Sequence, residues 1–464
     1  MERKNLILIL ASAGTFVEAL DIAIINLTVP SIQEQFGIGT ETIQWLQTLY
    51  VLFFGGFLII GGKLSDQVGR KTIFLWGSLI FLLTSLGAGL SPDFTMLAFF
   101  RAVQGLGAAF IMPSAMSIVV NTFKGDRERN RAIGIFSSFA AIGSGSGLSL
   151  GGIISTYLSW HWVFLINVPV LLVTLIFAYR YLPEDEKEAA QKTDLLSGII
   201  LVLGLLSLTY GTHELIHIKE HPFMVLGSLV VAVILLVYVV YRLKTAVHPL
   251  IDLRLFRHTS LVVSNLTFVM LGAFFIGFLF LISLMLQKDM HYSAASAGLM
   301  LVPFSAMSAL VAKFILPHIS GRLDSSQMGI LGWAFMIAGS LSLLISLYSG
   351  HLLLLVLLGA ACISGIGMTF CFTALSVLTV QDVDAPDYGV ASSLSSTSYF
   401  LGAGIGLSFM TLMSQVFPSE SAVGSLSLFI LVGYALTALF ILLYFIIRTI
   451  KIRKEKMAVH KYAG

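Results

Sequence analysis

The chain consists largely of apolar windows, each about 20 residues long, which are separated by charged or glycine- and proline-containing breaks. A helix of that length crosses the roughly 30 Å of hydrocarbon in a bilayer. Of the 464 residues, 57% are hydrophobic and 11% are charged, and the mean hydropathy is +0.93. These values exclude a soluble globular protein and predict an all-α polytopic membrane protein with about fourteen spans.

The basic residues orient these spans. We expect the spans near residues 6–30, 42–61, 73–91, 95–119, 131–156, 163–181, 195–213, 223–242, 259–286, 297–316, 328–348, 351–378, 389–413 and 424–447. If the N-terminus is cytoplasmic, Lys219 and Lys288 are the only Lys or Arg residues left outside. Because Lys and Arg concentrate in cytoplasmic loops, both termini are predicted to be cytoplasmic.

The first span carries two acids, Glu18 and Asp21, near its middle. Their i, i+3 spacing places both on one face of a helix. An ionised carboxylate costs several kcal/mol to bury, so embedded acids usually face a water-filled cavity, titrate or meet a cation. Two interpretations follow: a structural pair held by Arg101 and nearby hydroxyl groups, or a proton or cation site in a transporter.

Arg101 is the other ionisable residue expected deep in the membrane. It lies about as far inside the outer end of the fourth span as Asp21 lies inside the outer end of the first, so the two can meet. Protonation of Asp21, or a cationic substrate, would then compete with the ion pair. The alternative is a static buried ion pair.

The chain divides at its most polar internal stretch, residues 183–192. A similar pattern leaves the second span at 62–66 (GKLSD) and the tenth at 321–324 (GRLD), which suggests two related halves. We therefore predict four parts: an N-terminal six-helix bundle at 1–182, a linker with two extra transmembrane helices at 183–258, a C-terminal six-helix bundle at 259–448 and a basic cytoplasmic tail at 449–464.

The loop that leaves the second span reads GKLSDQVGRK over residues 62–71. Its glycines allow a tight reversal of the chain and a close approach of the helices. Its acid and bases can form ion pairs between helices, which break and reform as the bundles move. By composition alone, it would be interpreted as an ordinary basic loop on the cytoplasmic side of the membrane. The order of its residues, however, resembles the signature loop of the major facilitator superfamily.

Five more stretches resemble the fourteen-span drug:proton antiporters of that superfamily. They are residues 20–30 (LDIAIINLTVP), 45–50, 101–107 (RAVQGLG), 128–132 and 160–169 (WHWVFLINVP). The resemblance is clear from about residue 14 to 170 and fainter beyond. In the fifth span Gly143, Gly151 and Gly152 match the antiporter motif, but Gly147 is followed by Leu148 where the family has proline. The small residues still allow close helix packing.

The resemblance implies the major facilitator fold, with two six-helix bundles plus two inserted helices, and no enzymatic activity. It implies a proton-coupled multidrug efflux antiporter in a bacterial plasma membrane, which exports hydrophobic, often cationic compounds by alternating access. Proton coupling is expected at Glu18, Asp21 and Arg101. Conformational gating is expected at Gly62, Asp66, Gly69, Arg70, Lys71, Arg129, Gly143, Gly147, Gly151 and Gly152. Substrate binding is expected at Asn26, Trp45, Gln47, Tyr50, Gln104, Phe274 and Tyr399.

The sequence contains no nucleotide-binding P-loop, so we expect a proton gradient to drive transport without a cofactor or a metal. The expected partners are small drugs, protons and the lipid bilayer, with no nucleic acid, and we expect a monomer. The nearest alternative is a lipid or metabolite transporter on the same fold.

One motif indicates a different class of protein. Residues 213–217 read HELIH, a literal HExxH, which on a helix presents His213 and His217 to a zinc ion. An intramembrane metalloprotease is therefore a distant alternative. It is disfavoured because the motif lies at the outer end of a span, where a nearby third ligand could come only from Glu220 or His221.

Overall fold

The computed structural model describes residues 3–124, 126–184, 194–246, 249–320, 322–383, 388–417 and 423–462. Over these ranges the regular secondary structure is entirely helical. Fourteen helices are long and apolar enough to cross a membrane, which confirms the predicted all-α polytopic class. Most of the predicted linker and residue 321 of the second GRLD pattern lie outside the described residues.

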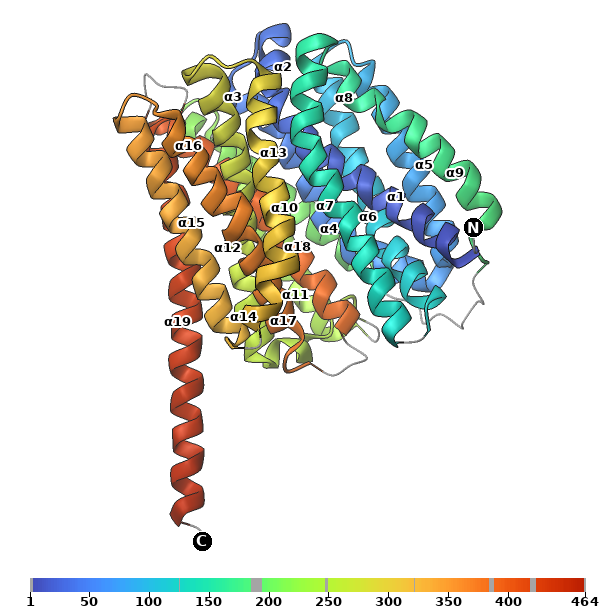
Figure 1. The fold of residues 1–464 in the computed structure, drawn as a ribbon, viewed down its shortest axis with the longest axis vertical. Helices are drawn as coiled ribbons and strands as arrows, with labels where there is room; N and C mark the ends of the chain where they lie inside the picture. Colours follow the sequence, from blue (N-terminus) through green and yellow to red (C-terminus); the bar gives the residue numbers. More distant parts are fainter. Residues whose placement is uncertain are drawn as a thin grey trace.

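The first part of the chain, up to residue 181, supplies six of these spans. Its elements are α1 (Arg3–Ile24), η1 (Ile25–Leu27), α2 (Val29–Phe36), α3 (Thr40–Ile43), α4 (Trp45–Val68), α5 (Arg70–Gly89), α6 (Phe94–Thr122), α7 (Asp126–Tyr157), α8 (His161–Leu165) and α9 (Asn167–Tyr181). Asp93 caps the start of α6, and its side chain accepts a hydrogen bond from the Met96 amide at 2.8 Å. In Figure 1, α2 and α8 lie at the upper end of the molecule.

Two helices, α10 (Leu195–His213) and α11 (Pro222–Thr245), follow as a hairpin, joined through η2 (Glu214–His217). Asp194 caps the start of α10, and Arg242 near the end of α11 binds its carboxylate through two nitrogens, at 2.7 and 3.0 Å. The two-nitrogen geometry fixes one end of the hairpin. The HExxH motif spans the end of α10 and η2, but the side chains of His213 and His217 lie outside the described part.

The last six spans form the C-terminal part. Its elements are η3 (Leu253–Arg257), α12 (Thr259–Leu284), η4 (Met285–Asp289), α13 (Ala294–Leu310), η5 (Val311–Ile315), α14 (Leu316–Ser320), α15 (Ser325–Tyr348), α16 (Leu353–Ala360), η6 (Ala361–Gly367), α17 (Met368–Val380), α18 (Tyr388–Val416) and α19 (Ser425–Tyr462). The backbone of α19 continues as a helix well below the rest of the protein (Figure 1).

Glycines bring the two halves together toward the upper end. On α7, a methyl group added at Gly152 would meet the backbone of Ala294 and Ala295 on α13. On α13, one added at Gly298 would lie 2.6 Å from the Leu148 carbonyl oxygen. The Ala295 amide also donates a hydrogen bond to Thr156 Oγ1 at 2.9 Å. The upper halves of α7 and α13 therefore pack backbone against backbone, as small residues permit.

Lower on α7 the same face is uncovered. Residues seven apart lie on almost one line along a helix. On this line, the Ser149 Cα would lie 3.2 Å from a methyl group added at Gly298 of α13, whereas Ile142 and Ile135 below it are 60% and 37% exposed. A side chain added at Gly134 would meet nothing within 4 Å. The two helices thus meet above and diverge below, as they follow different courses in Figure 1.

This packing predicts a specific effect of Gly298→Ala. The added methyl cannot fit beside the Leu148 carbonyl, so α7 and α13 should separate at their upper ends. The readout is a cysteine placed at Ser149 in a chain whose Cys362 and Cys371 are replaced by alanine. A membrane-impermeant maleimide is applied on the side of the membrane that the upper end of Figure 1 faces. We expect this cysteine to react several-fold faster in Gly298→Ala than in the same chain with Gly298. Gly227→Ala on α11 is the matched control, since nothing lies within 4 Å of its added methyl. Equal labelling in both variants would contradict the prediction.

Candidate functional site

A buried ion pair occupies the interior of the N-terminal part. Arg101 on α6 donates a hydrogen bond from Nη1 to Oδ2 of Asp21 on α1, and neither side chain has any exposed surface. Because each charge is costly to bury, the partners stabilise each other in place. The structure thus brings together two residues that the sequence predicted to meet.

Two amides complete the coordination of Asp21. Gln104, one turn along α6, donates from Nε2 to Asp21 Oδ1 at 3.2 Å, and Asn167, the first residue of α9, donates to the same oxygen at 2.9 Å. Gln104 also accepts from Arg101 Nη1 at 2.7 Å and donates to Ser85 on α5 at 2.8 Å. Asp21 therefore receives hydrogen bonds from three side chains, which come from α6 and α9.

Aromatic rings and a backbone carbonyl hold the arginine. The Arg101 guanidinium lies 4.2 Å from the centre of the Tyr50 ring and 5.7 Å from that of Phe164. Its Nε donates to the Leu46 carbonyl at 3.3 Å. Cation–π contact of this kind is strongest where water is excluded, as it is here. We call Asp21, Arg101, Gln104 and Asn167 the charge cluster.

Glu18 lies one turn from Asp21 on the same helix but has different surroundings. It is 5% exposed, and within the described part of the chain it makes no hydrogen bond or ion pair. Other polar groups of α1 and α4 share this property: the Thr15 hydroxyl, both amide atoms of Gln47 and the Tyr50 hydroxyl are buried without a hydrogen-bond partner among the described residues. Buried polar groups normally have partners, so this region can accept a polar ligand or a proton.

The residues predicted to bind substrate divide into two sets. Gln104 and Tyr50 contact Arg101, and Gln47, one turn before Tyr50 on α4, is buried without a hydrogen-bond partner among the described residues. The others lie elsewhere. The Asn26 amide, in η1, donates hydrogen bonds to two carbonyls at the end of α1, and the Trp45 ring centre lies 6.3 Å from that of Tyr210. Phe274 is buried edge-on to Trp333, and the Tyr399 ring centre lies 5.1 Å from that of Phe400. Substrate contact at all seven stays a prediction.

The predicted gating residues lie at two places. Gly69 ends α4 with φ 114°, a conformation that favours glycine, so it forms the reversal before α5, whereas Gly62 lies inside α4 opposite Pro113. Asp66, Arg70, Lys71 and Arg129 all have interaction partners. In α7, Gly143, Gly147 and Gly151 lie against the backbone of α1 from Phe16 to Ile24, while Gly152 faces α13.

Asn167 and Ser85 were not predicted as site residues. Asn167 lies within residues 160–169, a stretch that resembles the drug:proton antiporters, so this resemblance could have identified it as a site residue. Ser85 is one of many serines in apolar spans, and nothing in the sequence distinguishes it. Among the described residues, no group of three metal-ligating side chains is close enough to hold an ion.

A known family profile matches most of the chain, including all four residues of the charge cluster. The profile of the Major Facilitator Superfamily matches residues 11–407. The chain belongs to the Major Facilitator Superfamily. It is therefore a multi-pass membrane transporter and not an enzyme.

Individual relatives cover most of the chain. The multidrug resistance protein Stp of Mycobacterium tuberculosis (strain CDC 1551 / Oshkosh) is 30% identical over 411 residues, which are 88% of this chain and 76% of Stp. The cephamycin export protein CmcT of Amycolatopsis lactamdurans is 32% identical over 421 residues, which are 87% of this chain and 83% of CmcT. The crystal structure of the POT family transporter PepTSo is similar in fold, with a TM-score of 0.72 and 14% identity. The match covers 97% of this chain and 98% of the PepTSo chain.

The cluster predicts that Arg101→Met destabilises the protein and that a second substitution reverses the loss. Removing the cation leaves Asp21 as an uncompensated buried charge, which typically costs about 3–5 kcal/mol. Asp21→Asn in the same chain removes that charge. We expect a lower melting temperature for Arg101→Met, measured by size-exclusion chromatography after heating, and a near-normal one for the double variant.

Lys4→Met is the control, because Lys4 and Glu128 form an exposed ion pair at 3.0 Å, which should contribute little. If the double variant melts as low as Arg101→Met, the loss comes from packing around the arginine and not from an unpaired charge.

Proposed function

We propose that this transporter exports hydrophobic, often cationic drugs from a bacterial cell in exchange for protons, by alternating access. The names of two relatives, a multidrug resistance protein and a cephamycin export protein, support drug export. The embedded acids support proton exchange, since a protein needs a titratable group in the membrane to couple transport to a proton gradient. No cofactor takes part in this proposal.

The contrast between the two acids carries the proposal. Asp21 already receives hydrogen bonds from Arg101, Gln104 and Asn167, whereas Glu18 makes none within the described residues. A carboxylate without a partner is the one that gains most from a proton or from a cationic substrate. We assign Glu18 as the group for which the proton and the drug compete, and the charge cluster as its rigid support.

The cluster also connects this site to helix movement. Asp21 and Glu18 lie on α1, and α1 packs against α7 at Gly143, Gly147 and Gly151. The next glycine on α7, Gly152, faces α13 of the other half. A change of charge at α1 therefore lies one helix away from the contact between the halves, where it can bias their separation.

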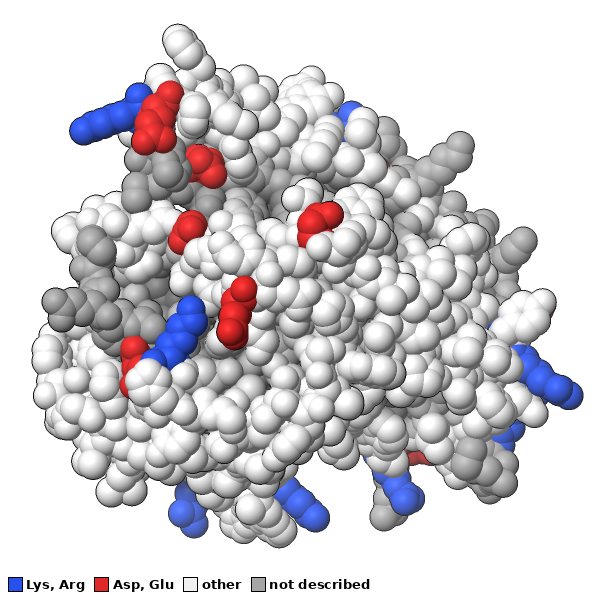
Figure 2. Space-filling model, turned by 90° about the horizontal axis from the view of Figure 1, so that it is seen from above, with Lys and Arg blue, Asp and Glu red and all other residues white. Residues whose placement is uncertain are grey.

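The distribution of Lys and Arg supports an orientation in which the lower end of the protein in Figure 1 faces the cytoplasm. Figure 2 looks onto the upper end, where the central part of the face carries few basic side chains and most of the visible Lys and Arg lie at its edge. Cytoplasmic faces are normally rich in Lys and Arg. In this orientation α7 and α13 are closed toward the outside and diverge toward the cytoplasm, which corresponds to an inward-open state able to collect drugs from the cell.

The deciding experiment is transport by purified protein in liposomes. With an imposed pH gradient, we expect wild-type protein to move a lipophilic cation such as ethidium. Glu18→Gln removes the group that exchanges the proton, so its gradient-driven rate should fall at least about tenfold, as expected when an essential proton-transfer group is lost. Glu34→Gln is the matched control, because Glu34 is exposed on α2.

Full gradient-driven transport by Glu18→Gln would show that Glu18 is not the coupling group. If wild-type protein moves neither cations nor neutral drugs but moves labelled phospholipid or a metabolite, the drug assignment is wrong and the alternative transporter on the same fold is correct.

A further inference from the structure

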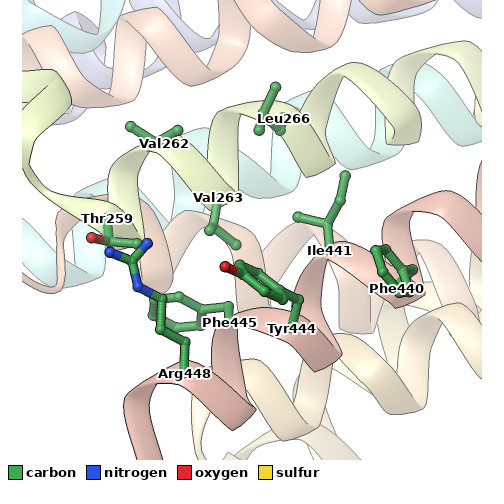
Figure 3. A pocket seen from close by; sticks show the side chains of 9 residues that line it. All are labelled: Thr259, Val262, Val263, Leu266, Phe440, Ile441, Tyr444, Phe445 and Arg448. Carbon is green, nitrogen blue, oxygen red and sulfur yellow. The ribbon is translucent and has the colours of Figure 1, made fainter. Parts of the chain in front are cut away.

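A groove lies between the first and last helices of the C-terminal part, away from the charge cluster. Its lining comes from the start of α12 and the middle of α19 (Figure 3), and its volume is about 260 Å³. The lining residues are Thr259, Val262, Val263, Leu266, Phe440, Ile441, Tyr444, Phe445 and Arg448. All but three of them are purely apolar.

The groove opens sideways into the membrane. Its floor is buried, with Val263 at 8% and Phe445 at 9% exposure, while Leu266, Phe440 and Tyr444 on its rim are 51%, 70% and 58% exposed. Both helices belong to candidate spans, Thr259–Asp289 and Ser425–Thr449, so these rim residues face hydrocarbon. From Thr259 to Leu266 an α-helix rises roughly 10 Å, about a third of the hydrocarbon thickness.

One end of the groove carries a positive charge. Arg448 is exposed, lies one residue before the end of its span and makes no ion pair within the described residues. Figure 3 shows its guanidinium pointing toward Thr259, with the Tyr444 hydroxyl nearby. Arg257, two residues before Thr259, is also exposed, whereas Arg254 is already paired with Asp252 at 2.7 Å. An apolar groove that ends in a guanidinium and two hydroxyl groups complements a phosphate with an attached acyl chain.

We propose that this groove binds one anionic phospholipid of the cytoplasmic leaflet, with its phosphate on Arg448 and one acyl chain along Val263 and Leu266. The proposal uses the orientation given above but is independent of proton coupling. A transported drug is a poor occupant, because the cationic drugs proposed as cargo would be repelled by Arg448. Bound lipid would bridge α12 and α19 and stabilise their contact.

The test is lipid retention by the intact chain. Protein in detergent is mixed with equal amounts of dioleoyl phosphatidylglycerol and dioleoyl phosphatidylcholine, and the retained lipid is counted by native mass spectrometry. We expect wild-type protein to retain the anionic lipid preferentially and Arg448→Gln to reduce that preference about fivefold, the value of one basic contact at a membrane surface. Arg448→Lys keeps the charge and should keep the preference.

Two further variants separate this site from general surface charge. Arg180→Gln removes an exposed basic residue from the last turn of α9, distant from the groove, and should leave the preference unchanged. Val262→Phe fills the groove without altering charge and should reduce retention of both lipids, even if Arg448→Gln fails to yield monodisperse protein.

Three results would overturn the proposal: equal retention of the two lipids by wild-type protein, an equal loss of preference in Arg180→Gln and Arg448→Gln, or displacement of the lipid by glycerol phosphate alone. The first and third would show that no anionic lipid is held by its chain and phosphate together. Failure of drug transport in the liposome experiment would leave these outcomes unaffected, so the two proposals fail separately.

Discussion

The ion pair between Asp21 and Arg101 organises the N-terminal part of the protein. Both side chains are fully buried, so each requires the other to offset the loss of hydration. The pair joins α1 to α6, and Gln104, Asn167 and the Tyr50 ring extend it to α5, α9 and α4. One electrostatic contact thereby determines how five helices are placed around the middle of the bundle.

The contacts between the two halves are of a different kind. At the upper end they depend on glycines and backbone atoms of α7 and α13, with the Thr156 hydroxyl as a polar contact. Such contacts are shape-dependent and involve no buried charge, so they can separate without exposing an unpaired ion. This combination supports the proposed alternating access, because the surfaces between the halves can part while the charged interior of the N-terminal part keeps its ion pair.

Sequence reasoning predicted the meeting of Asp21 and Arg101 because both lie in motifs at matching depths in their spans. It grouped Gln104 and Tyr50 with substrate residues, which stays a prediction, and it did not predict that both contact Arg101. It did not anticipate Ser85, which becomes part of the network only because α5 packs beside α6. The two acids, which the sequence could not distinguish, differ in the structure by their partners: three donors for Asp21 and none among the described residues for Glu18.

By itself the sequence determined the number of spans, the helical class and the presence of costly charges within the membrane. Each of these follows from local hydropathy and from the requirement that backbone groups be hydrogen-bonded in lipid. Only the tertiary structure decided which acid is satisfied, which glycine on α7 faces its own bundle or the other one, and that α12 and α19 enclose a groove ending at Arg448. The physical reason is that hydrogen bonds and ion pairs act over a few Å, and distances between residues 80 positions apart depend on how whole helices pack.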